Sequence, residues 1–220
     1  MNTELQKRTF TSIVLIFLLA LMFLYSFIMI TALIVIAIII WVEFYALISK
    51  IIKKNKFKHK FLRFFYKAIS LLYLSLIVYL IFAIVSFYPN QKIYLLYAIL
   101  VAILSDIGGL IIGKTFKGKK LTKISPNKTV SGSIGSFVFS LFLIPLFNET
   151  LIKYDLLILI VITLFISLTT QIGDLLISYI KRKAKVKNTS DLLPGHGGIL
   201  DRVDGIIFAI PIGLLLFNIF

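Results

Sequence analysis

The sequence has no cysteine and only two histidines, which excludes disulfides, thiolate metal sites and metal cages built from imidazoles. It also lacks a Walker-type phosphate loop and any Ser–His–Asp or Cys–His arrangement, so covalent catalysis is not favoured. Acidic residues are scarce, with nine Asp and Glu against 24 Lys and Arg and a net charge of +15. Because the basic residues lie in the gaps between apolar runs, and not among aromatics on one solvated face, nucleic-acid binding is not indicated.

Hydrophobic residues, in contrast, make up 60% of the 220 positions. A soluble domain of this length would have too little polar surface to cover such a core, so its solvent must be lipid. Most of the apolar runs approach the roughly 20 residues that a helix needs to span a bilayer. The runs are Phe10–Tyr25, Phe27–Ile48, Ala68–Phe87, Ile93–Ile112, Ser133–Phe147, Leu156–Ile180 and Val203–Phe220. We predict an all-α, polytopic transmembrane helical bundle of about seven spans, with six as the alternative.

The basic residues are distributed unequally between the two sides of the membrane. With seven spans, 22 of the 24 lie on one side, and only Lys92 and Lys153 lie on the other. The basic side holds the amino terminus and the loops 50–67, 114–128 and 181–202. The positive-inside rule therefore predicts a multi-pass protein of the cell inner (plasma) membrane, with its amino terminus and its active site facing the cytoplasm. A transporter would show the same bias, so the bias predicts topology and not function.

Four of the nine acidic residues lie within apolar runs or at their cytoplasmic mouths, namely Asp106, Asp174, Asp201 and Asp204. A carboxylate at mid-bilayer costs roughly 2.5–3.5 kcal/mol on insertion scales, so such a residue usually has a partner or a purpose. Glu43 lies near the end of the second run, and we expect it simply to reach the membrane interface.

The sixth run carries a polar stripe whose members are spaced 4, 3, 4 and 3 residues apart. The stripe consists of Ser167, Gln171, Asp174, Ser178 and Lys181. This spacing places them on one helical face, while Leu, Ile and Val fill the other faces. Because lipid would not tolerate the stripe, it must face a protein interior or a water-filled cavity. Hydrogen bonding between helices accounts for Ser167, but a functional role explains Asp174 and Lys181 better.

Two of the basic loops contain residues suited to binding phosphate. In the segment 193–204 (LPGHGGILDRVD), three glycines let backbone N–H groups approach a phosphate closely, just before a helix begins. Asp201 and Asp204 are three residues apart there, so both can face one site. The loop 113–132 supplies lysines, hydroxyls and glycines, about two turns after Asp106. Carboxylates for a hard cation beside many cationic groups suit metal-assisted transfer between phosphate-bearing substrates.

The segment from Ser178 to Asp204 closely resembles the phosphatidate cytidylyltransferase signature, through the pattern S-x-I-K-R-x4-K-N-x-S-x2-L-P-x-H-G-G-I-x-D-R-V-D. Upstream, GDL at 173–175, ISPNKT at 124–129 and Asp106 followed by Gly113 resemble further motifs of that family. The likeness covers about Asp106 to the carboxyl terminus, whereas the amino-terminal half matches only as hydrophobic spans. We therefore expect residues 1–90 to form amino-terminal membrane helices and residues 91–220 to form the catalytic membrane domain.

The resemblance implies an enzyme of phospholipid biosynthesis that transfers a cytidylyl group from CTP to phosphatidic acid, giving CDP-diacylglycerol and pyrophosphate. It implies that Asp174 and Asp201 hold Mg²⁺, with a second cation as an option, and act in catalysis together with Lys181 and Arg202. The implied substrate-binding residues are Asp106, Lys128, Ser178, Arg182, Lys187, His196, Gly197, Gly198 and Asp204. The expected partners are CTP, phosphatidic acid and membrane lipids, with a homodimer as a further expectation.

Three positions depart from the family pattern and leave alternatives open. Asn188 replaces an Asp of the signature, Ile177 stands where many members have Glu, and Ser131 stands where many have Glu or Gln. Each change removes acidity from the site, which motivates a degenerate, non-catalytic member as one alternative. A second is a related CTP-dependent enzyme acting on another lipid phosphate or a polyprenol. A transporter with an Asp–Lys relay is the third, disfavoured by the near absence of ionisable residues in the first three spans.

Overall fold

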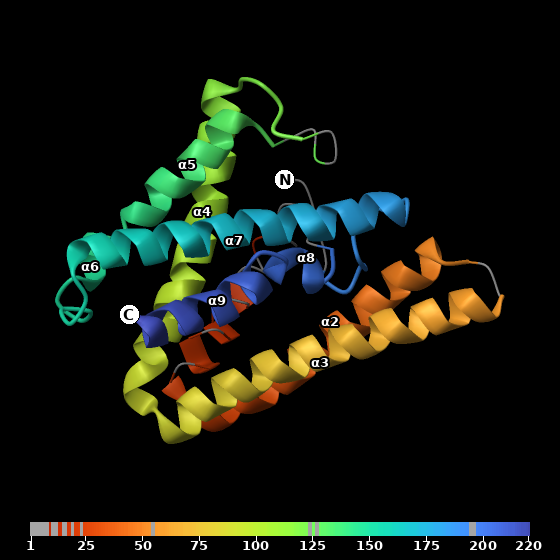
Figure 1. Cartoon of the computed structure of the whole chain (residues 1–220), viewed down its shortest axis with the longest axis horizontal. Coiled ribbons are helices and arrows are strands. Elements are labelled where there is room, and N and C mark those ends of the chain that lie inside the picture. Colours follow the sequence, from red (N-terminus) through yellow and green to blue (C-terminus); the bar gives the residue numbers. More distant parts are fainter. Residues whose placement is uncertain are drawn as a thin grey trace. The chain divides into compact units, whose positions relative to one another are not determined.

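The computed structural model describes residues 9, 13, 14, 17, 18, 20–22, 24–53, 56–122, 125, 128–193 and 197–220. Its helices are α2 (Ser26–Ile51), α3 (Phe57–Phe87), α4 (Lys92–Phe116), α5 (Val130–Leu141), α6 (Ile144–Phe147), α7 (Leu156–Lys183), α8 (Leu200–Val203) and α9 (Ile206–Ile219), with a short 3-10 turn η1 (Pro89–Gln91) (Figure 1). In these ranges the chain forms no β-strand, only isolated bridges between Lys120 and Thr129 and between Leu193 and Gly197. The predicted all-α class is confirmed.

Six helical segments of the described chain are long and apolar enough to cross a membrane. They are Ser26–Ile51, Phe57–Phe87, Pro89–Phe116, Val130–Phe147, Leu156–Lys183 and Leu200–Ile219. These segments confirm the second to seventh predicted spans. Seven of the sixteen residues of the first predicted span, Phe10–Tyr25, lie outside the described residues, so that span and the amino-terminal orientation stay predictions.

One predicted boundary was wrong. Helix α3 begins at Phe57, eleven residues before the predicted start at Ala68, so much of the expected loop 50–67 is helical. Its lysines break the apolar run but not the helix, because Lys and Arg are good helix formers whose long stems can carry the charge to the interface. With 31 residues α3 is about 46 Å long, well over the roughly 30 Å of a hydrocarbon core.

The fifth predicted span is a broken helix. Helix α5 ends at Leu141 and α6 begins at Ile144, with Pro145 in the first turn of α6. Proline is tolerated there because its missing N–H would have no partner inside the helix anyway. The last predicted span is likewise divided, into α8 and α9.

The chain divides into two compact units, Met1–Pro89 with Ile180–Val203, and Asn90–Tyr179 with Asp204–Phe220. The amino-terminal unit thus includes a segment of the predicted catalytic domain, while the functional division itself stays a prediction.

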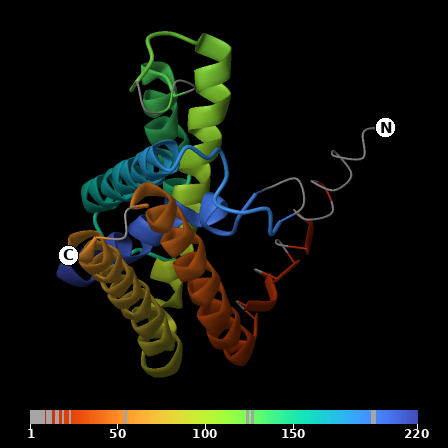
Figure 2. The ribbon, with the colours of Figure 1, turned by 90° about the vertical axis from the view of Figure 1, so that its right-hand side faces the viewer.

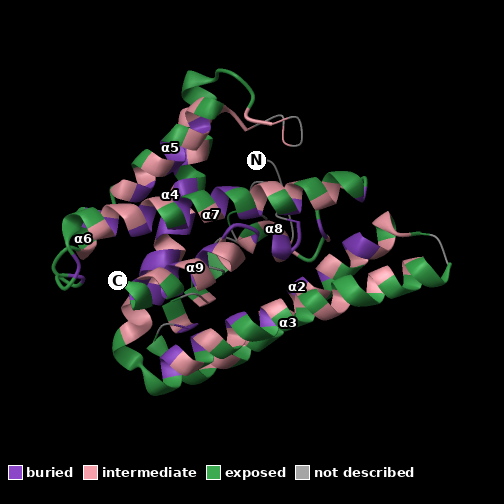
Figure 3. Cartoon of the chain, in the orientation of Figure 1, coloured by how far each residue is buried: buried purple, intermediate pink, exposed green. Residues whose placement is uncertain are grey.

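In the amino-terminal unit, α2 and α3 lie side by side (Figures 1 and 2). The indole N–H of Trp41 donates to the carbonyl of Lys67 at 3.1 Å. The Lys67 ammonium lies 4.8 Å from the centroid of the Trp41 ring and 4.9 Å from that of Tyr45. Many large apolar side chains of this pair are exposed, as expected of helices that face lipid (Figure 3).

The second unit is built on close contacts between small residues. Helix α4 packs against α5 so tightly that a Cβ on Gly108 would lie 2.5 Å from the carbonyl oxygen of Gly135. Such approach of two backbones is typical of packing between membrane helices. Buried hydroxyls join α4 to α7, through Tyr97 to Thr163 at 2.6 Å and Ser105 to Ser167 at 2.9 Å. This packing holds α4, α5 and α7 around the pocket of this unit.

Candidate functional site

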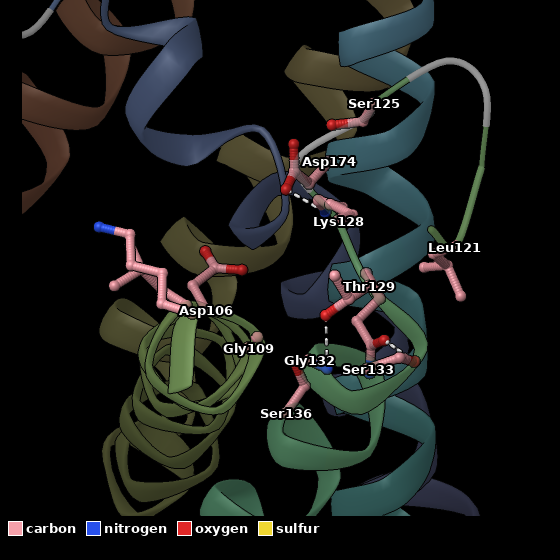
Figure 4. Close-up of a pocket in the computed structure, with 14 residues that line it drawn as sticks. Asp106, Gly109, Leu121, Ser125, Lys128, Thr129, Gly132, Ser133, Ser136 and Asp174 are labelled. Atoms are coloured by element: carbon pink, nitrogen blue, oxygen red, sulfur yellow. Dashed lines mark hydrogen bonds and ion pairs between the residues drawn. The ribbon is translucent and has the colours of Figure 1, made fainter. Parts of the chain in front are cut away.

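A pocket of about 410 Å³ lies in the second unit, within the size range of small-molecule sites. Its walls come from α4, the 117–129 loop, α5 and α7 (Figure 4). The lining residues are Asp106, Gly109, Leu110, Gly113, Lys114, Leu121, Ser125, Lys128, Thr129, Gly132, Ser133, Ser136, Gln171 and Asp174. The structure therefore brings together three residues predicted for the site: Asp106, Lys128 and Asp174.

An ion pair between Lys128 and Asp174 forms one side of this pocket. The second oxygen of Asp174 accepts a hydrogen bond from the Ser178 hydroxyl at 3.2 Å, as two residues one turn apart on α7 can do. Asp106 lies across the pocket on α4 (Figure 4). Because the side chains of Lys128 and Asp174 keep 27% and 22% of their surface exposed, an incoming ion or phosphate can reach both.

Backbone hydrogen bonds set the position of Lys128. The Leu121 N–H donates to the Lys128 carbonyl at 2.8 Å, and the Lys128 N–H donates to the Ser125 carbonyl at 3.0 Å. The next residue, Thr129, caps α5 by accepting the Gly132 N–H at 3.0 Å. The loop therefore folds back on itself and presents Lys128 from a fixed helix start. Of the motif at 124–129, residues 124, 126 and 127 lie outside the described ranges.

The polar stripe of α7 faces protein, as its spacing predicts. Ser167 is fully buried, and Gln171 accepts a hydrogen bond from the Ser133 hydroxyl of α5 at 2.5 Å. Gly173, one position before Asp174, has no room for a side chain, because a Cβ would lie 2.4 Å from the Phe208 ring and 2.9 Å from the Asp204 carbonyl. Helix α9 thus packs directly against α7 beside Asp174.

The glycine-rich loop of the amino-terminal unit is the segment 189–200, of which residues 189–193 and 197–200 are described, and it lies around the Asp201 carboxylate. One carboxylate oxygen, Oδ1, accepts from the Lys181 ammonium at 2.7 Å. The other, Oδ2, accepts from the N–H groups of Thr189 and Gly198, at 2.8 and 3.0 Å, and lies 3.0 Å from the Thr189 hydroxyl. Both side chains of this ion pair are largely buried, at 12% exposure for Lys181 and 8% for Asp201. The pair is therefore enclosed by the loop that it holds.

Gly197 and Gly198 of this loop serve packing inside the protein. Gly197 has a φ of +83°, and its N–H donates to the Leu193 carbonyl at 3.1 Å. At Gly198, a Cβ would lie 2.0 Å from the Thr189 hydroxyl. Two of the N–H groups that the sequence suggested for phosphate, those of Gly197 and Gly198, are thus used within the loop, because folding the backbone around Asp201 consumes them. The predicted role of both glycines toward substrate stays a prediction.

Glu43 of α2 is the residue that sequence reasoning misjudged. It does not reach the interface as expected but is buried, at 5% exposure. Its carboxylate accepts from the hydroxyls of Thr189 and Ser190, at 2.8 and 2.6 Å, and from the N–H groups of Ile199 and Leu200, at 3.1 and 2.8 Å. Hydrogen bonds to a charged group contribute about 1.5–3 kcal/mol each, so four of them outweigh the roughly 2.5–3.5 kcal/mol that inserting a charge costs. The signal was present, because an acid inside an apolar run requires a partner.

The other predicted residues are divided between the two units. Asp106, Lys128, Asp174, Ser178 and Asp204 belong to the second unit, and Lys181, Arg182, Lys187, Gly197, Gly198, Asp201 and Arg202 to the amino-terminal unit. His196 lies outside the described residues. The cationic side chains of Arg182, Lys187 and Arg202 are exposed. A single cation held by both Asp174 and Asp201 therefore stays a prediction.

Whether the site fits Mg²⁺ depends on its oxygen donors. Over the described ranges, no three Asp, Glu or His side chains gather into a cluster that could hold a metal by themselves. Mg²⁺ rarely uses such a cage, since it binds one or two carboxylates and completes its octahedron with water and substrate phosphates. Asp106 and Asp174, together with the hydroxyls lining the same pocket, supply that donor set. The pocket thus fits Mg²⁺ delivered with a polyphosphate, while Lys128 can neutralise further phosphate charge.

Comparison with known proteins adds independent findings. The profile of the cytidylyltransferase family matches residues 1–220. The chain is 43% identical over 131 residues to the phosphatidate cytidylyltransferase of Bacillus subtilis (strain 168), covering 58% of this chain and 48% of the relative. It is also 43% identical over 122 residues to the proteins of the same name from Staphylococcus saprophyticus and Staphylococcus aureus (strain COL), covering 54% of this chain and 46% of each relative. The chain spans about half the length of the curated relatives it matches.

Proposed function

The chain belongs to the cytidylyltransferase family, and from this premise we propose that it transfers the cytidylyl group of CTP to phosphatidic acid. An oxygen of the lipid phosphate attacks the α-phosphorus of CTP, the bond from that phosphorus to the β-phosphate bridge breaks, and pyrophosphate leaves. The products are CDP-diacylglycerol and pyrophosphate. The observation that carries the proposal is the pocket that joins Asp106, Asp174 and Lys128 within a membrane-spanning helical unit.

The groups in the pocket match the demands of this reaction. Both substrates are phosphate anions, so they repel each other until cationic side chains neutralise their charge. Lys128, already held on the pocket wall, can exchange its carboxylate partner for a phosphate oxygen. A lipid phosphate is an adequate nucleophile once it is aligned, so no covalent enzyme intermediate is required.

Magnesium would be held in this pocket by Asp106 and Asp174. When bound, it would neutralise the triphosphate and favour departure of pyrophosphate. The protein's own contribution is to orient the phosphates with Lys128 and to keep the carboxylates apart from lipid. Asp201 would act together with Lys181 of α7, and comparing the single and double aspartate variants decides whether Asp201 shares the cation.

The proposed location is the plasma membrane, with the pocket open to the cytoplasm. The basic loops support this orientation through the positive-inside rule, and the relatives come from bacteria. Cytoplasmic CTP would then reach the site directly, and the lipid would enter from the surrounding bilayer. A homodimer stays a prediction.

The proposal can be tested with the full chain, purified in detergent and mixed with CTP, Mg²⁺ and phosphatidic acid. We expect CDP-diacylglycerol and pyrophosphate in equal amounts. Asp106→Asn should abolish most of this activity, while Asp155→Asn, the same change at an exposed loop position outside the pocket, should leave it unchanged. Product from a polyprenol or another lipid phosphate, but not from phosphatidic acid, would replace the proposed acceptor. No CTP turnover with any acceptor would overturn the function.

A further inference from the structure

Glu43 joins the two ends of the glycine-rich loop. Thr189 and Ser190 lie where the loop leaves the basic segment, and Ile199 and Leu200 lie where α8 begins. One carboxylate on α2 accepts a hydrogen bond from each of these four residues, so it ties together the two ends of the twelve-residue segment 189–200. All of these residues belong to the amino-terminal unit.

The same loop determines where Asp201 lies. The carboxylate of Asp201 accepts the N–H groups of Thr189 and Gly198, and these two residues stand next to the Glu43 carboxylate. The Thr189 hydroxyl lies 2.8 Å from Glu43 and 3.0 Å from Asp201. A hydroxyl carries one hydrogen and can donate to one carboxylate at a time. Because Asp201 Oδ2 already accepts two N–H groups, this hydrogen is best used on Glu43. The position of Asp201 therefore depends on Glu43 through Thr189.

The partners of Glu43 in the loop all donate to its carboxylate. The four donors are two hydroxyls and two backbone N–H groups, and they are shared between its two oxygens. A glutamine has the same shape but would turn an NH₂ group toward two of these donors. A residue present only to pack α2 against the loop would not need the charge. The chemistry of the contacts thus separates a positioning role from simple packing.

We propose that Glu43 is a positioning residue of the transfer site, which holds the glycine-rich loop in the conformation that presents Asp201 to Lys181 of α7. This inference rests on the proposed function for its catalytic consequence, but not for the order of the loop itself. It gives the amino-terminal helices a part in the reaction, although they carry no residue of the family signature.

Loop order can be measured without any catalysis. The chain has no native cysteine, so a nitroxide can be attached at a single cysteine introduced at exposed Leu192, and in a second sample at exposed Phe61 on α3. We expect Glu43→Gln to increase the mobility of the label at position 192 severalfold and to leave the label at position 61 unchanged. Ser49→Ala, which removes an exposed hydroxyl from the same helix, should change neither label.

A second variant and a kinetic measurement keep the test decisive. Ser190→Ala removes one donor to Glu43 and should give a smaller increase in mobility at position 192. In the transfer assay Glu43→Gln should lower kcat at least tenfold, with a smaller change in the KM for CTP, because positioning acts mainly on the transition state. An unchanged label at position 192, or equal loosening at position 61, would overturn the inference. A parent without transferase activity would overturn the proposed function, and the two labels would still decide the role of Glu43.

Discussion

The two lysine–aspartate pairs of this protein have the same composition and opposite surroundings. Lys128 and Asp174 line an open pocket, and each keeps about a quarter of its side chain exposed. Lys181 and Asp201 are buried, and backbone N–H groups of the glycine-rich loop occupy the remaining oxygen of the aspartate. A lysine in an exposed pair can exchange its carboxylate for an incoming phosphate, whereas an enclosed pair fixes the conformation of the surrounding chain. The first is therefore suited to contact with substrate and the second to positioning.

The largest expected contrast concerns which side of the membrane each pair faces. If both pairs serve one reaction, the loops beside them must share an aqueous side. Single cysteines can replace three exposed residues, Lys117, Lys183 and Asn148. The cysteines at positions 117 and 183 should both resist an impermeant thiol reagent added to intact cells, while the cysteine at position 148 should react. If the cysteines at positions 117 and 183 reacted from opposite sides of the membrane, the two lysine–aspartate pairs could not act on one substrate.

Removing the aspartates should have the next largest effect. Asp174→Asn and Asp201→Asn should each reduce turnover roughly a hundredfold or more, because losing an anionic oxygen removes positioning and charge neutralisation together. If the two act as a single unit on one cation, the double variant should be scarcely worse than either single variant. A double variant whose loss of turnover equals the product of the two single losses, in protein that stays folded in detergent, would show that the aspartates act separately.

The lysines should separate activity from stability. Lys181→Met leaves the Asp201 charge buried without its partner, which costs about 3 kcal/mol and should lower the melting temperature by several degrees. Lys128→Met breaks an exposed pair worth about 0–1 kcal/mol, so stability should hardly change while the KM for CTP rises about tenfold. Melting curves and CTP titrations of both variants test this. Equal melting temperatures would remove the distinction between the two pairs.

The smallest effect is expected at Asn188. This residue is exposed and packs beside Gly197, whereas the carboxylates that accept hydrogen bonds from the loop backbone are those of Asp201 and of Glu43 on α2. Asn188→Asp and Asn188→Ala should both keep turnover within several-fold of the parent. A loss of several orders of magnitude in Asn188→Ala would show that the amide contributes directly to the reaction, and the departure from the family signature would then gain functional meaning.

Much of the second unit could be predicted from local pattern. The 4-3-4-3 spacing placed Ser167, Gln171, Asp174 and Ser178 on one face of α7, and the structure confirms that Ser167 and Gln171 bond to neighbouring helices. Asp106 and Lys128 were expected in the site from their motifs and do line the pocket with Asp174. Such predictions succeed because helix periodicity and short motifs are properties of neighbouring residues.

The amino-terminal unit shows where local pattern fails. Glu43 contacts residues 146 to 157 positions away, and no spacing rule connects such distant positions. Its place near the predicted end of an apolar run also suggested an interfacial side chain. Because α2 continues to Ile51, Glu43 lies about 12 Å inside the helix end. The start of α3 was missed for a related reason, since hydropathy detects where charges interrupt an apolar run and not where a helix begins.

The Thr189 hydroxyl, placed between Glu43 and Asp201, has a consequence for how this protein can change over evolutionary time. Three positions on two distant segments meet at one hydroxyl, so a substitution at any one of them alters what the other two can tolerate. Drift at this site should therefore proceed by paired replacements: a lineage that loses the acid at position 43 is expected to change residue 189 as well. Covariation between positions 43 and 189 in an alignment of relatives would show this dependence.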